Sequence, residues 1–117
     1  LVVTYTTPPV IIGKGQDAYS LEIDASLNVT GYISSSASSS TQITKAWHYV
    51  AMTYDGANIK LYVDGVLKVT TAKTGAIGTN STNLLMASSM AGKLDDMRVY
   101  NRALSQTEIT ALYESYR

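Results

Sequence analysis

Hydrophobic and polar residues alternate along most of this chain with a period of two. Between residues 18 and 24, Tyr19, Leu21 and Ile23 fall on one face of an extended segment, and the polar side chains between them fall on the other. The same reasoning predicts strands at residues 1–5, 10–12, 18–24, 27–33, 47–54, 59–63, 66–70, 84–87 and 94–100. The serine-rich run 34–42 is interpreted as a surface loop with room for a ragged strand.

Two Asp-Gly pairs join three of these segments. Asp55-Gly56 follows residues 47–54, and Asp64-Gly65 separates residues 59–63 from residues 66–70. Asp-Gly between apolar strands favours a tight hairpin, because a type I′ turn needs positive φ at both central residues. Residues 47–70 are therefore predicted to form a three-stranded meander.

The last segment is predicted to be a short amphipathic helix. Ser105 is a good N-cap, and Glu108 three residues later completes a capping box, while Leu104 can pack on Ile109. Apolar side chains then recur at helical spacing, which predicts a helix docked on the outside of a sheet. The fold class that follows is all-β, an antiparallel β-sandwich with one short C-terminal helix.

Composition narrows the choice of partners. The chain has 117 residues, nine acidic and nine basic side chains and no cysteine. It is expected to form one domain over residues 1–117. Balanced charge without a basic stripe argues against nucleic acid, and no apolar run is long enough to span a membrane. The absence of cysteine excludes disulfides and thiolate metal sites.

The chain contains three recognisable motifs, at residues 47–56 (WHYVAMTYDG), 60–65 (KLYVDG) and 92–105 (GKLDDMRVYNRALS). In sequence and in order they resemble the laminin G-like, concanavalin A-like jelly-roll superfamily of lectins and glucanases. The resemblance implies a non-catalytic recognition module of a larger secreted or surface protein, with a glycan as ligand. The alternative is a structural or adhesive module that contacts extracellular protein and binds no sugar.

The resemblance also implies that the chain is truncated relative to complete members, which begin with a further strand or two. Their opening strand lies close to the closing strand, here residues 94–100. Its loss would expose a strand edge, and an exposed edge invites pairing with another chain. We therefore expect a homo-oligomer formed through this edge.

Catalysis is not expected. Glu22-Ile23-Asp24 is similar to the first part of a glucanase motif, but Ser26 and Leu27 stand where a second glutamate would be needed. The two carboxylates are interpreted as surface groups on a strand. His48 is the only histidine, and neither a nucleophile motif nor further zinc ligands accompany it, so it is interpreted as structural.

Metal and sugar sites are predicted from residue type and from the superfamily. Asp95 or Asp96 could donate a ligand to a structural calcium ion, since many members bind calcium through aspartates. The alternative is that one aspartate bonds loop amides while the other is solvated or paired with an arginine. Tyr62, Tyr5 and Tyr32 are the candidate sugar platforms. Trp47 is expected in the core, and the loops 71–83 and 87–92 are candidate binding rims.

Overall fold

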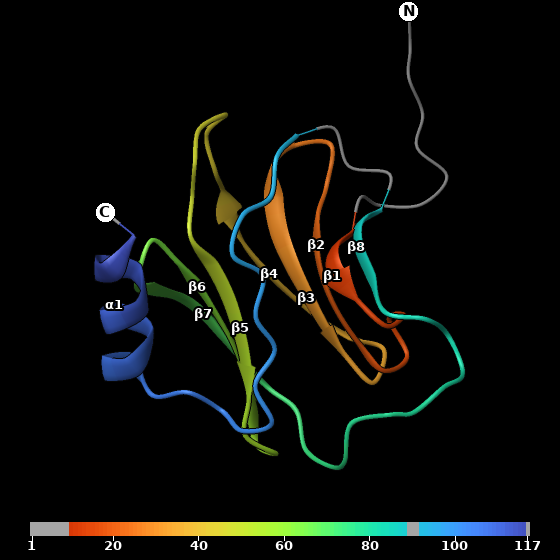
Figure 1. The fold of residues 1–117 in the computed structure, drawn as a ribbon. Coiled ribbons are helices and arrows are strands. Elements are labelled where there is room, and N and C mark those ends of the chain that lie inside the picture. The colour runs from red at the N-terminus through yellow and green to blue at the C-terminus, as the bar shows by residue number, and fades with distance from the viewer. Residues whose placement is uncertain (1–9, 89–91, 117) are drawn as a thin grey trace, which may run out of the picture.

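The computed structural model describes residues 10–88 and 92–116, which form two antiparallel sheets and one helix. The larger sheet has the strand order β4-β3-β2-β1-β8, and its strands are β1 (Val10–Gly13), β2 (Tyr19–Ile23), β3 (Asn28–Ile33), β4 (Ser36–Gln42) and β8 (Leu85–Ser88). The smaller sheet, β5-β6-β7, consists of β5 (Val50–Tyr54), β6 (Asn58–Val63) and β7 (Val66–Ala72). Figure 1 shows the two sheets facing each other, with α1 (Gln106–Ser115) on the outside of the smaller one. The predicted β-sandwich with one C-terminal helix is confirmed.

The main core lies between the two sheets. Its buried residues are Ile11, Leu21, Val29, Leu61 and Val63. A second, smaller cluster lies on the opposite face of the three-stranded sheet, where Leu104 and Ile109 cover the ring of Tyr62. Burial on both faces of β6 explains why Ile59, Leu61, Tyr62 and Val63 are all buried.

Gly31 brings the two layers into close contact. A Cβ atom at this position of β3 would lie 2.5 Å from Sδ of Met52 and 2.9 Å from Cδ2 of Leu61. Met52 and Leu61 belong to the facing sheet, so their side chains fill the space that any other residue at position 31 would need.

Both hairpins predicted from the Asp-Gly pairs form. Asp64 and Gly65 have φ values of 53° and 79°, as a type I′ turn between β6 and β7 requires. The Asp55 carboxylate instead accepts hydrogen bonds from the backbone N–H groups of Ala57 and Asn58, which makes a longer connection between β5 and β6.

The capping box of α1 also forms as predicted. Oγ of Ser105 accepts a hydrogen bond from N–H of Glu108, and Oε1 of Glu108 accepts one from N–H of Ser105 at 3.1 Å. Ile109 is buried against the sheet. The cap satisfies donors that the first turn of a helix otherwise leaves unpaired.

Three element predictions need correction, and one lies outside the described residues. Residues 36–42 form a full strand, where a surface loop with room for a ragged strand was expected. Ser34 and Ser35 take positive φ in a tight hairpin turn, and the hydroxyl of buried Ser38 bonds Thr71 of the facing sheet. The strand predicted from residue 47 begins only at Val50. Residues 94–100 form no strand, since Asp96 has φ 54° and interrupts the extended pattern. The strand predicted at residues 1–5 falls outside the described part of the chain.

Candidate functional site

A cavity of about 1260 Å³ opens between the two sheets, along the side bounded by β5 and residues 92–102. Its floor comes from apolar side chains of β1 and β2, among them Ile12, Leu21 and Ile23. In Figure 1 the segment after residue 92 runs between the two sheets, next to β5. The loop 43–49 also lines the cavity, so residues from three separate parts of the sequence meet here.

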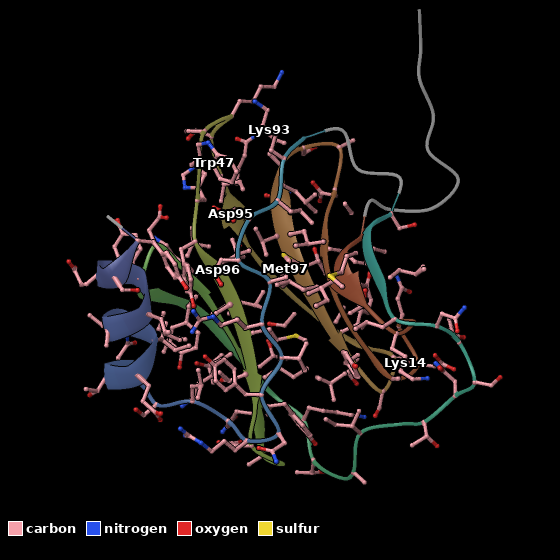
Figure 2. The ribbon with its side chains drawn as sticks, viewed as in Figure 1. Lys14, Trp47, Lys93, Asp95, Asp96 and Met97 are labelled. Atoms are coloured by element: carbon pink, nitrogen blue, oxygen red, sulfur yellow. The ribbon has the colours of Figure 1, made fainter. Side chains whose placement is uncertain are left out.

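Trp47 lies at one end of this cavity and is 67% exposed, so its prediction as a core residue is wrong. It belongs to the loop before β5 rather than to the strand, and the loop carries it beyond the end of the sheet. Figure 2 shows Trp47 and Lys93 at the same end of the sandwich, with Asp95 just below them. All three residues line the cavity.

Hydrogen bonds of His48 hold the loop that carries Trp47 in place. Its Nδ1 lies 2.8 Å from Oδ2 of Asp64, and its Nε2 lies 2.8 Å from Oγ1 of Thr44. Oδ1 of Asp64 also accepts a hydrogen bond from N–H of Tyr49 at 3.0 Å. Partial burial alone would raise the pKa of Asp64, but the bonds from His48 and Tyr49 outweigh it and lower that pKa. One imidazole thus links both ends of the loop to the turn after β6.

Asp96 belongs to a polar and aromatic cluster that joins residues 92–104 to α1. The Tyr116 hydroxyl and the Arg98 guanidinium both lower the pKa of this carboxyl, and Nε of Arg98 lies 3.0 Å from Oδ1 of Asp96. The guanidinium lies 5.9 Å from the ring centre of Tyr116, which stacks on Tyr49 at a centroid distance of 5.9 Å. This arrangement matches one part of the alternative, the pairing of an aspartate with an arginine.

Asp95 is exposed and makes no hydrogen bond or ion pair with any residue of the described chain. On a regular strand it would point away from its neighbour, but the positive φ of Asp96 allows both carboxylates to line the cavity. Within residues 10–88 and 92–116, no group of three acidic or histidine side chains could hold a metal ion. Calcium needs six to eight oxygen ligands. The described residues therefore do not fit a calcium site unaided, and calcium binding stays a prediction.

The three predicted sugar platforms have different surroundings. Tyr62 does face away from the main core, as predicted, but only 3% of it is exposed because α1 covers that face of the sheet. Its ring cannot stack on a sugar while the helix is docked, which corrects the expectation of an open ring. Tyr32 is half-buried on β3 beside Ser20, and Tyr5 lies outside the described residues.

Comparison with known proteins agrees with this architecture. The sequence model of the family described as the concanavalin A-like lectin/glucanases superfamily matches residues 2–110. The chain belongs to this superfamily. A comparison with curated proteins found no significant match for this concanavalin A-like domain.

Among solved structures, the domain is similar to the crystal structure of an S-layer domain-containing protein (residues 221–444) from Clostridium thermocellum ATCC 27405. The two share 22% sequence identity, and the match covers 97% of this chain and 67% of the other with a TM-score of 0.46. None of the helices in the described residues has the length and apolar character needed to cross a membrane.

Both carboxylates of the glucanase-like segment, Glu22 and Asp24, accept hydrogen bonds from neighbouring residues in this concanavalin A-like domain. Glu22 is 3% exposed, not a surface group as expected, and it accepts hydrogen bonds from the Ser20 hydroxyl at 2.7 Å and the Gln16 amide at 3.1 Å. Asp24 accepts bonds from the N–H groups of Ser26 and Asn28, which lower its pKa. Each carboxylate is thus engaged in holding its own strand or turn.

The sequence analysis predicted Asp95 and Asp96 as metal ligands, and it did not predict that Trp47 and Lys93 line the same cavity as these aspartates. Trp47 was assigned to a strand that begins three residues later. The signal was available in part, because Lys45-Ala46-Trp47-His48 carries two polar side chains and fits poorly with a buried strand end. The position of Lys93 at the same end of the sandwich as Trp47 depends on tertiary structure and has no local signature.

Proposed function

We propose that this domain is a non-catalytic recognition module of a larger secreted or surface protein, and that it binds glycans at Trp47. The observation that carries the proposal is the 67% exposed indole at the end of the cavity. A large exposed aromatic ring held on a pinned loop loses little conformational freedom on binding.

The polar groups that line the same cavity as Trp47 suit a sugar. An indole face packs against the CH face of a pyranose ring, while neighbouring polar groups fix its orientation through hydrogen bonds to hydroxyls. Lys93 supplies donors and Asp95 supplies acceptors, and neither side chain is engaged by another described residue. The neighbouring Asp96 is held by Arg98, so it contributes to the wall rather than to ligand contact.

Intrinsic fluorescence tests the proposal directly, because Trp47 is the only tryptophan in the chain. Titration with glycans that score on an array should change the emission of Trp47 in a saturable way. Trp47→Ala should weaken binding at least tenfold, equivalent to about 1.4 kcal/mol. The melting temperature should stay close to that of the parent, since the side chain lies outside the core.

Tyr32→Ala is the matched control, since it removes an aromatic ring from the five-stranded sheet and leaves Trp47 intact. Binding lost in Tyr32→Ala but retained in Trp47→Ala would move the site to that sheet. A folded domain that binds no glycan on the array, with no change in Trp47 emission, would refute glycan binding and favour the structural or adhesive module.

A further inference from the structure

Thr44, His48 and Asp64 form a hydrogen-bonded chain of a hydroxyl, an imidazole and a carboxylate. Oγ1 of Thr44 lies 2.8 Å from Nε2 of His48, and Nδ1 of the same ring lies 2.8 Å from Oδ2 of Asp64. A hydroxyl within hydrogen-bond reach of a base that a third group orients is the signature of an activated nucleophile. The sequence analysis found no nucleophile motif beside His48, because such a triad is recognised by geometry and not by its order along the chain.

The carboxylate of Asp64 decides which ring nitrogen of His48 is free to act as a base. Partial burial would raise the pKa of Asp64, but hydrogen bonds from His48 and from N–H of Tyr49 lower that pKa, so the ionised group only accepts hydrogen bonds. The proton of a neutral ring is then held on Nδ1, which donates it to Oδ2. The lone pair of Nε2 therefore faces the hydroxyl of Thr44 and can accept its proton.

The backbone holds Thr44 on both sides. N–H of Ile43 donates to the carbonyl of Leu27 at 2.9 Å, and N–H of Ala46 donates to the carbonyl of Thr44 at 2.9 Å. A nucleophile held between fixed neighbours needs little reordering to reach its reacting geometry.

The hydroxyl of Thr44 is also accessible. Thr44 is exposed, and all three members of the triad line the open cavity described above. N–H of Lys45, the next residue, has no hydrogen-bond partner among residues 10–88 and 92–116. This donor is thus free to bind the oxygen on which negative charge develops when a carbonyl group is attacked.

We propose that Thr44 is a covalent modification site that takes a small acyl group from an activated ester, with His48 as the base and Asp64 as the residue that positions it. Oγ1 of Thr44 forms a bond to the acyl carbon, the bond from that carbon to the leaving oxygen breaks, and the hydroxyl proton passes through Nε2 of His48 to the leaving group. The products are an O-acyl threonine and the free alcohol of the ester. The methyl group of threonine crowds the new ester, so we expect the acyl group to stay on the protein. The inference is separate from glycan binding at Trp47.

Acetylation of the intact domain by p-nitrophenyl acetate tests the proposal. Thr107, an exposed threonine of α1, is the reference hydroxyl within the same molecule. Peptide mapping by mass spectrometry should find that Thr44 is acetylated at least about a hundredfold faster than Thr107, the effect expected of a positioned base. Hydroxylamine should then remove the acetyl ester from Thr44 and leave the amides of acetylated lysines in place.

Variants separate activation of the hydroxyl from a merely structural role of the triad. Thr44→Val should abolish acetylation at position 44, whereas Thr44→Ser should retain it. His48→Ala and Asp64→Asn should each slow it at least about tenfold, measured where circular dichroism shows that the variant is folded. Thr70 is exposed on β7 and does not line the cavity, so Thr70→Val should react like the parent protein.

Three results would overturn the proposal. The first is acetylation of Thr44 that is no faster than acetylation of Thr107. The second is fast acetylation of Thr44 in folded His48→Ala, which would show that the imidazole does not activate the hydroxyl. The third is acetyl found on lysines or on the ring of His48 while Thr44 stays unmodified.

Discussion

The imidazole of His48 lies 2.8 Å from the carboxylate of Asp64, and this contact joins the loop before β5 to the turn after β6. Asp64 takes φ 53° in that turn, so its side chain is directed by a backbone conformation that few residues adopt. The same histidine bonds Thr44 on its other nitrogen. His48, interpreted from the sequence as structural, thus holds the loop that carries Trp47, the proposed sugar platform.

His48→Ala should lower the free energy of unfolding by about 1–2 kcal/mol, because it removes two hydrogen bonds, one of them to a charged group. Chemical denaturation monitored by circular dichroism measures the loss. Thr44→Val, which removes only the bond to Nε2, should cost less. Equal stability of His48→Ala and the parent protein would contradict the assigned role.

Ser105→Ala should destabilise the domain by about 1 kcal/mol through loss of the helix cap. Thr107 is exposed on the first turn of α1 and makes no contact described above, so Thr107→Ala serves as the control. The control should be neutral or slightly stabilising, since alanine has the higher helix propensity. The melting temperatures of the two variants provide the measurement, and an equal loss of stability in both would contradict the role of the cap.

Glu108 should make stability depend on acid pH. Hydrogen bonds from Arg102, then from N–H of Ser105, lower the pKa of Glu108 to about 2 from 4.5. A depressed pKa means that the folded state favours the ionised form, so this contribution is present above about pH 4.5 and is lost as the pH falls toward 2. Glu108→Gln should flatten the melting-temperature profile over that window. Parallel profiles for the two proteins would refute the linkage.

Lys14→Met should loosen the long connection between β7 and β8. The Lys14 ammonium donates to O and Oδ1 of Asn80 and to O of Thr82, at 2.7, 2.8 and 2.8 Å. Loss of these charge-assisted bonds should speed proteolysis within residues 73–84 and lower stability by about 1–2 kcal/mol. Lys73→Met, at the start of the same connection, should change neither. Figure 2 shows Lys14 at the opposite end of the sandwich from Trp47, so Trp47 emission should stay unaltered.

Calcium should bind weakly if it binds at Asp95 and Asp96, in the millimolar range typical of sites with few charged ligands. Arg98→Ala would release Asp96 from its ion pair, so it should strengthen calcium binding, whereas Asp95→Asn should abolish it. Melting curves in calcium and in EDTA provide the measurement. If calcium and EDTA give the same melting curve, both for the parent protein and for Arg98→Ala, the calcium prediction is wrong.

Local signals predicted most of the fold, because they depend on short-range chemistry. The capping box at Ser105 and the Asp64-Gly65 turn need only neighbouring residues, and both form. The full length of the strand 36–42 was not predicted, because serine has little strand propensity and the pairing of this strand depends on β3 and on Thr71 of the facing sheet. Tertiary contacts overrode local preference there.

The candidate site was harder to predict for the same reason. Alternation placed Tyr62 on the outer face of its sheet, but no pattern within residues 59–63 reveals that α1 covers that face. Trp47 was predicted to be buried because its neighbours are apolar, but it is exposed because it lies before the start of β5. Long-range packing, rather than residue type, decides which aromatic ring meets solvent.

Gly31 sets a limit on how this domain can be altered. Sδ of Met52 and Cδ2 of Leu61 lie where a Cβ atom would be, so even alanine at this position would make these two side chains move within the core between the sheets. The missing side chain of one glycine therefore decides how closely Met52 and Leu61 pack against β3, and substitutions that reshape the cavity are safer at residues 92–102 than at Gly31.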